Sequence, residues 1–242
     1  MTRFSRHPLA LVVLLTFSLV ARVNAQTTIT VANSDFETNG LADGGFSSGV
    51  IPTSWSAVTT LTGSFFGYFN PTASAYSGTT GSPGTNGTMS GPNIFYFGSA
   101  VTGEGIQQTL AANFTANTNY TLTVAVGTRA GNLANTGFLD LLLLAGSTVI
   151  ASTSARNLTA DSFADFSLNF DALAAGSTFN SVLAQALTIR FVENDTSLPG
   201  TVFEADIDNV RLTSVTAVPE PATYALLALG ALSVFVLRRR KV

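Results

Sequence analysis

Carboxylates are almost the only side chains in this sequence that could do chemistry. The sequence contains no cysteine, and its one histidine, His7, lies in the N-terminal segment. A Ser-His-Asp or Cys-His catalytic site and a His/Cys zinc site are therefore excluded from the rest of the chain. Any metal bound there must be held by oxygen ligands.

Two pairs of aspartates have a spacing that invites comparison with glycosidases. Asp206 and Asp208 lie two residues apart, and Asp161 and Asp165 lie four apart. Two acids two residues apart on a strand face the same side at about 7 Å, which is within the range of a glycosidase acid/base pair. Such spacing is common by chance and defines no cleft. We therefore expect a protein that is not an enzyme, with a carboxylate-dependent glycan-active enzyme as an alternative.

The N-terminus has the features of a secretory signal peptide. Arg3 and Arg6 form a basic start, residues 9–20 are apolar, and Ala25 ends a small-residue cleavage site. This pattern predicts a signal peptide over residues 1–25 that is cut after Ala25.

The C-terminal segment, residues 218–242, consists of a short motif, an apolar stretch and a basic end, in that order. The motif spans residues 218–223 and contains Pro219, Glu220 and Pro221. The apolar stretch 222–237 would form about 24 Å of helix at about 1.5 Å per residue. The basic tail that follows is Arg238, Arg239, Arg240 and Lys241. A basic end after an apolar stretch predicts a transmembrane helix with its tail in the cytoplasm.

This C-terminal pattern resembles the PEP-CTERM sorting signal, which exosortase recognises and processes. The resemblance implies an exported protein of the cell envelope or outer surface, anchored in the membrane by the C-terminal helix at least before processing. The partners it implies are exosortase, the secretion machinery and the membrane. It often implies a link to exopolysaccharide or biofilm matrix as well.

Residues 26–217 are expected to form one domain, because their 192 residues suffice for one core and no repeat divides them. This segment has four arginines, no lysine and 13 acidic residues, so its net charge is 4 − 13 = −9. Nucleic acid binding requires a basic surface, so nucleic acid is not an expected partner.

The periodicity of the domain is that of β-strands. Apolar residues alternate with polar or small ones over 120–127 and 187–192. Further candidate strands are 28–32, 53–58, 65–69, 94–98, 106–110, 137–144, 147–152, 163–170 and 202–213. Many short strands predict an all-β fold, a single antiparallel β-sandwich of jelly-roll type, with a β-helix as the alternative. The Gly- and Pro-rich segment 77–92 predicts a long loop.

A second resemblance involves residues 33–37, Trp55 and residues 206–212. These segments are similar to carbohydrate-binding modules of the galactose-binding-like jelly-roll class. In many of those modules the first and last strands lie together and hold a structural calcium ion through carboxylates and backbone carbonyls. The carboxylates that the resemblance implies as calcium ligands are Glu37 and Asp208, with Asp35 and Asp206 as helpers. The alternative is that these acids are solvated or cap a turn.

The alternation of the last strand slips by one residue. Ala205 and Ile207 occupy odd positions, whereas Val210 and Leu212 occupy even ones. The slip predicts a β-bulge at Asp208, which would redirect its carboxylate.

Aromatic residues are concentrated between residues 55 and 97, and most are expected in the core because burying a ring stabilises the fold more than exposing it. Trp55, Tyr68 and Tyr76 are the candidates for a ligand groove. The leading hypothesis is an exported, non-catalytic envelope protein associated with extracellular polysaccharide or biofilm matrix. A structural surface protein without a specific ligand is the other alternative.

Overall fold

The computed structural model describes residues 26–61, 66–72, 76, 89–97, 103–129, 137–156, 158–159, 162–176, 178–195, 204–216 and 230. The predicted signal peptide, most of the predicted loop 77–92, and the sorting segment apart from residue 230 lie outside these residues. Within the part of the chain that is described, no helix is both long enough and apolar enough to span a bilayer.

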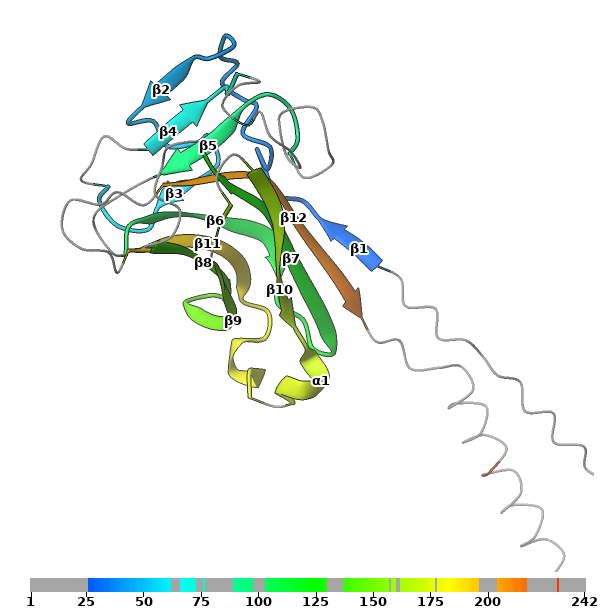
Figure 1. Ribbon diagram of the computed structural model, residues 1–242. Helices are drawn as coiled ribbons and strands as arrows, with labels where there is room; N and C mark the ends of the chain where they lie inside the picture. Colours follow the sequence, from blue (N-terminus) through cyan, green and yellow to red (C-terminus); the bar gives the residue numbers. More distant parts are fainter. Residues whose placement is uncertain are drawn as a thin grey trace, which may run out of the picture. The chain divides into compact units, whose positions relative to one another are not determined.

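Two antiparallel sheets make up the domain, and they pack face to face (Figure 1). The larger sheet has the order β10-β7-β12-β5-β4-β2, with β1 beside β12. Its strands are β1 (Gln26–Ile29), β2 (Phe46–Ser48), β4 (Phe66–Phe69), β5 (Ile94–Phe97), β7 (Thr118–Thr128), β10 (Ser162–Phe170) and β12 (Ala205–Thr216). The prediction of an all-β, antiparallel sandwich is confirmed, and the jelly-roll type of connectivity stays a prediction.

The smaller sheet has the order β3-β6-β11-β8-β9. Its strands are β3 (Ser56–Ala57), β6 (Gly105–Asn113), β8 (Gly137–Ala145), β9 (Thr148–Ala155) and β11 (Ala186–Asp195). Two short helical turns, α1 (Ala172–Ala175) and η1 (Asn180–Val182), lie between β10 and β11. The sequence did not predict β2, because Phe46 in this three-residue strand is 67% exposed and no apolar alternation marks it.

The main core lies between the two sheets and follows the predicted periodicity. Leu122 and Val124 of β7 are fully buried there, as are Ile189 and Phe191 of β11. The opposite, outer face of the larger sheet carries a second apolar cluster. Its members are Phe69, Tyr76, Ile94, Tyr96, Ala125 and Phe163, with Met89 packed against them. The larger sheet is therefore covered on both faces in this region.

The predicted bulge in the last strand is confirmed. The register between β12 and β7 shifts between Asp208 and Arg211, and Asn209 has a φ of 48°. Asparagine tolerates this left-handed conformation better than most residues. The backbone N–H of Val210 donates to the carbonyl of Ser34 at 2.9 Å. The bulge thus fastens the segment that follows β1 to the middle of β12.

The first and last strands lie side by side, with Gln26 opposite Val215 and Ile29 opposite Leu212 (Figure 1). This pairing agrees with the strand arrangement that the second resemblance implies. It brings the acidic residues after β1 close to those of β12.

Candidate ligand and metal site

A row of four residues crosses the outer face of the larger sheet. Phe163 of β10 lies opposite Gly127 of β7, Gly127 opposite Asp206 of β12, and Asp206 opposite Tyr96 of β5. A Cβ atom on Gly127 would lie 2.7 Å from the Phe163 ring. Glycine at this position therefore leaves room for the Phe163 ring, which packs on Tyr76 with 4.8 Å between ring centroids.

Asp206 is fully buried, and its two carboxylate oxygens differ in their contacts with the described residues. The Tyr76 hydroxyl donates to Oδ2, and Nε of Arg129 lies 3.5 Å from the same oxygen. The other oxygen, Oδ1, is buried without a hydrogen-bond partner in the described part of the chain. Burial raises the pKa of the Asp206 carboxyl to about 6, although Arg129 and then Tyr76 act to lower it.

Arg129 follows directly after β7 and covers this carboxylate. Its guanidinium forms an ion pair with Glu204 and lies over two rings, 4.6 Å from the centroid of Phe69 and 5.2 Å from that of Tyr96. The Arg129 side chain is 24% exposed, whereas Glu204 is 14% exposed. The rings of Phe69 and Tyr96 are 8% and 7% exposed, so the arrangement joins two nearly buried rings, a guanidinium and two carboxylates in one cluster.

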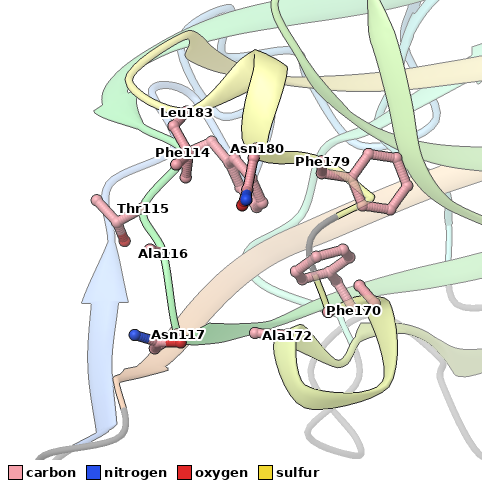
Figure 2. A pocket seen from close by; sticks show the side chains of 11 residues that line it. Phe114, Thr115, Ala116, Asn117, Phe170, Ala172, Phe179, Asn180 and Leu183 are labelled. Carbon is pink, nitrogen blue, oxygen red and sulfur yellow. The ribbon is translucent and has the colours of Figure 1, made fainter.

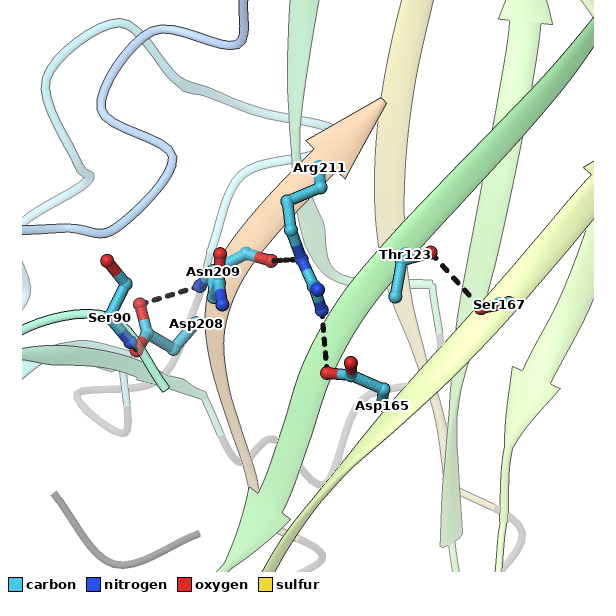
Figure 3. Close-up of polar contacts among 7 residues, drawn as sticks. All are labelled: Ser90, Thr123, Asp165, Ser167, Asp208, Asn209 and Arg211. Atoms are coloured by element: carbon cyan, nitrogen blue, oxygen red, sulfur yellow. Dashed lines mark hydrogen bonds and ion pairs between the residues drawn. The ribbon is translucent and has the colours of Figure 1, made fainter. Parts of the chain in front are cut away.

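A second acidic group is centred on Asp208, at the bulge. Its Oδ2 accepts a hydrogen bond from the backbone N–H of Ser90 at 2.7 Å, and its Oδ1 accepts one from the backbone N–H of Asn209 at 2.6 Å (Figure 3). Burial raises the pKa of Asp208 to about 8. The two amides lower it, and the nearby carboxylates of Glu37 and Asp35 raise it further.

Glu37 is held beside this group by Asn93. The backbone N–H of Asn93 donates to Oε1 at 2.7 Å, and its side-chain amide donates to Oε2. Gly91 has a φ of +78°, and a Cβ atom there would overlap the Glu37 carboxylate. Burial raises the pKa of Glu37 in spite of the Asn93 hydrogen bonds, and Asp35 adds a smaller upward effect.

The predicted calcium ligands are only partly brought together. Glu37, Asp35 and Asp208 are close enough for their charges to interact, whereas Asp206 contacts Tyr76 and Arg129 instead. Asp35 accepts a long hydrogen bond, 3.5 Å, from the backbone N–H of Glu37, which is the turn-capping role given as the alternative. Among the described residues, no three His, Cys, Asp or Glu side chains converge on a point that could hold a metal.

The chemistry of the donors nevertheless suits calcium. Glu37 and Asp208 offer only oxygen, and calcium accepts six to eight oxygen ligands in irregular geometry. Burial is the main cause of the raised pKa values of Glu37 and Asp208, and neighbouring carboxylates raise both pKa values further. Calcium at Glu37 and Asp208 therefore stays a prediction.

The three predicted ligand-binding aromatics lie in different environments. Trp55 is 7% exposed, stacks on Phe191 with 5.6 Å between ring centroids, and donates from Nε1 to the carbonyl of Asn33 at 3.3 Å. Tyr68 is fully buried in the same core, and its hydroxyl accepts a hydrogen bond from the backbone N–H of Thr53. Tyr76 alone lies beside Asp206.

Sequence reasoning missed Arg129, Tyr96 and Phe163 as members of the site. Arg129 is an isolated arginine without a local signal, Tyr96 was expected in the core, and Phe163 was predicted only as part of a strand. Strand register brings them to Asp206, and register between distant strands cannot be read from one strand's periodicity.

The rest of the outer face near Asp208 is polar. Arg211 pairs with Asp165 at 2.7 Å, and the hydroxyls of Thr123 and Ser167 lie 3.1 Å apart (Figure 3). Asp165 thus faces an arginine, and Asp161, its partner in the second aspartate pair, lies outside the described residues.

A separate pocket lies where α1 and η1 approach the β6–β7 turn (Figure 2). The rings of Phe114, Phe170 and Phe179 line it together with Asn117 and Asn180. No titratable side chain lines this pocket, so it contributes no acid, base or charged ligand.

The fold and the two acidic groups define a β-sandwich protein with a buried carboxylate site on the outer face of its larger sheet. The chain belongs to the HpiC1 cyclase family, whose model matches residues 27–213. The PEP-CTERM protein-sorting motif matches residues 217–241, which confirms the predicted sorting signal and marks an exported, exosortase-sorted protein. No curated protein sequence matches the chain.

Two solved cyclase structures share the fold. The Stig cyclase FisC from Fischerella sp. TAU, in complex with (3Z)-3-(1-methyl-2-pyrrolidinylidene)-3H-indole, is 26% identical with a TM-score of 0.63, and the match covers 80% of this chain and 100% of that one. A cyclase from the same organism, in complex with 4-(1H-indol-3-yl)butan-2-one, is 25% identical with a TM-score of 0.62, over 80% and 100% of the two chains. Carbohydrate-binding modules also occur among the neighbours, including TmCBM61 in complex with β-1,4-galactotriose, at 12% identity and a TM-score of 0.47 over 77% and 98% of the chains.

Proposed function

We propose that this protein is an exported, non-catalytic component of the cell envelope that binds extracellular polysaccharide or biofilm matrix at the outer face of its larger sheet. The observation that carries the proposal is the site around Asp206. Its buried Oδ1 lacks a donor within the described residues, and the Arg129 guanidinium near its Oδ2 lies over the rings of Phe69 and Tyr96. A sugar has hydroxyl donors for the carboxylate and apolar ring faces for the aromatic side chains.

The sorting signal supports the same proposal. An exosortase-sorted protein acts in the envelope, where polysaccharide is abundant, and the acidic domain contains no histidine or cysteine for nucleophilic catalysis. A calcium ion at Glu37 and Asp208 would join the segment after β1 to β12 and so stabilise the same face. That ion would have a structural role, without any part in a reaction.

Cyclase-like catalysis on a small indole-containing molecule is the second candidate. It is favoured by membership of the cyclase family and by the two Fischerella cyclases that hold indole compounds. The buried Asp206 carboxyl, placed between aromatic rings and hydrogen-bonded to Tyr76, is the group that could exchange a proton with such a ligand. Both candidates use the same site, so one set of ligands can separate them.

Calorimetric titration of the purified protein distinguishes the two functions. We expect binding of oligosaccharides from a panel of β-linked glucose, xylose and N-acetylglucosamine hexamers, and no consumption of 4-(1H-indol-3-yl)butan-2-one or of an indole substrate of the cyclases in mass spectrometry. Asp206→Asn should weaken glycan binding about tenfold or more, because a ligand hydroxyl loses a charged acceptor. Asp43→Asn, which changes an exposed acid, is the matched control. Turnover of an indole compound that Asp206→Asn abolishes would instead establish the enzyme.

A further inference from the structure

The outer face of the smaller sheet, opposite the main core, carries an arginine on its central strand. On the core side, Leu141 of β8 and Phe191 of β11 are fully buried. Their neighbours along the chain, Leu142 and Arg190, lie opposite one another on the outer face and are partly exposed. Arg190 also lies opposite Gln107 of β6, and its Nε donates to Oε1 of that side chain at 2.9 Å. This hydrogen bond holds the guanidinium on the outer face.

A second arginine lies on the same face. Arg156 follows directly after β9 and is exposed, and its guanidinium lies over the Phe138 ring of β8, 3.5 Å from the centroid. Leu139 is in the core, so Phe138 and the guanidinium over it lie on the outer face. Phe138 is opposite Asn194 of β11, four residues along that strand from Arg190. Four residues along a strand and two strand spacings across the sheet place the backbones of the two arginines about 16 Å apart.

These two arginines differ from the other two arginines of residues 26–217 in their partners. Arg129 and Arg211, beside and within the larger sheet, form ion pairs with carboxylates. Arg156 and Arg190 form none with any residue that the structure describes, although the domain has 13 acidic residues. A guanidinium binds a carboxylate through two parallel hydrogen bonds. Each of these two positions can therefore take a carboxylate from a ligand.

An acid, Asp140 of β8, shares the outer face, but its hydrogen bonds come from other side chains. The Ser154 hydroxyl donates to its Oδ1, and the side-chain amide of Asn194 donates to its Oδ2. Two arginines and this aspartate give the face a local charge of +1, whereas residues 26–217 as a whole carry 4 − 13 = −9. At physiological salt, charges are largely screened beyond about 8 Å. A bound anion therefore interacts mainly with the arginines.

From these contacts we infer that the outer face of the smaller sheet binds an acidic polysaccharide, with carboxylates of two uronic acid residues at Arg156 and Arg190. The separation of the two arginines favours a polymer, because a single carboxylate does not span it and a chain with a carboxylate on each sugar does. Leu142 and Ser152, which lie opposite one another between these positions, offer an apolar contact and a hydroxyl to the sugar rings. This inference goes beyond the proposed function, because it uses a different sheet and a different ligand charge from the site at Asp206.

Galacturonate hexamer and its methyl ester test the inference, because they share one sugar chain and differ in charge. Each is titrated by calorimetry into the purified full-length protein. We expect the acid form to bind about tenfold or more tightly than the ester, as charge-assisted hydrogen bonds predict. Monomeric galacturonic acid, which occupies one arginine at a time, should bind at least about tenfold more weakly than the hexamer.

Variants separate this face from general attraction to the protein. Arg156→Gln and Arg190→Gln should each weaken binding of the galacturonate hexamer about tenfold, because each removes one charged donor. Arg156 is exposed, so its variant tests the face even if Arg190→Gln does not fold. Arg211→Gln removes the same charge from the larger sheet and should keep the affinity. Equal losses in Arg156→Gln and Arg211→Gln would overturn the inference.

The outcomes also separate this inference from the function proposed at Asp206. If the acid form binds no better than its ester, or does not bind, the inference fails and the Asp206 site is unaffected. If galacturonate binds and the neutral hexamers do not, the inference stands and the site at Asp206 fails. Binding to phosphatidylserine vesicles that Arg156→Gln abolishes, without binding of galacturonate, would assign the face to a membrane surface and overturn the inference.

Discussion

Replacing Trp55 by alanine will lower the free energy of unfolding by about 3–5 kcal/mol, the usual cost of removing a large buried aromatic side chain. The Trp55 ring contacts Phe191 of the smaller sheet and Phe36 of the segment after β1, with ring centroids 5.6 Å and 5.7 Å away. Its indole N–H also donates to the carbonyl of Asn33. The substitution therefore removes packing and one hydrogen bond at once.

Equilibrium urea unfolding measures this change, and Phe46→Ala is the matched control. Phe46 is an aromatic residue of comparable chemistry that is 67% exposed, so its removal should change the free energy of unfolding by no more than about 0.5 kcal/mol. If Trp55→Ala kept its stability and lost glycan binding, the core role would be wrong and the predicted ligand role of Trp55 would be right.

Calcium in excess will raise the melting temperature of the protein by several degrees. A ligand at a hundred times its dissociation constant stabilises the folded state by about 2.7 kcal/mol, and for a domain of this size each kcal/mol corresponds to about 2–4 °C. Asp208→Asn should abolish the shift, because it removes one of the two central carboxylates. Asp43→Asn, at an exposed acid of the same type, should preserve it. A shift of equal size in both variants would place the ion elsewhere.

In chelator, the metal-free protein should lose stability as the pH rises from about 4 to about 8. Burial raises the pKa of Asp208 to about 8 and that of Asp206 to about 6, both above the ordinary value of 3.8. Between the unfolded and folded pKa values the folded state binds more protons than the unfolded state, so raising the pH favours unfolding. Thermal melts at half-unit pH steps measure the slope, and calcium should flatten it because the ion competes with the protons. A melting temperature that rises over this interval in chelator would contradict the raised pKa values.

Much of the fold could be predicted because it depends on local alternation. The apolar residues that alternate over 120–127 and 187–192 are the buried ones in the structure. The one-residue change in this alternation between Ile207 and Val210 coincides with the bulge in β12. Strand β2 has too few residues to display a period, and only its pairing with β4 makes it a strand.

The sequence predicted the aspartates of the candidate site but not the residues that contact them. Asp206 and Asp208 were selected together because residues two apart on a strand share a face, yet their neighbours differ. Asp206 meets Arg129 and Tyr76, whereas Asp208 meets the backbone amides of Ser90 and Asn209. Alternation of polar and apolar residues along a strand predicts which face of the sheet a side chain lies on. It does not predict which residues of the neighbouring strands it contacts.

The sequence by itself determined the sorting signal, the strand-rich domain, the bulge at Asp208, and the absence of histidine and cysteine chemistry from residues 26–217. These properties depend on residue type and on order along a short segment. The tertiary structure alone decided that Arg129 and Tyr96 lie next to Asp206, that Phe163 packs on Tyr76, and that Trp55 belongs to the core. Those contacts depend on the register between strands far apart in the chain, which is set by the packing of the whole sandwich.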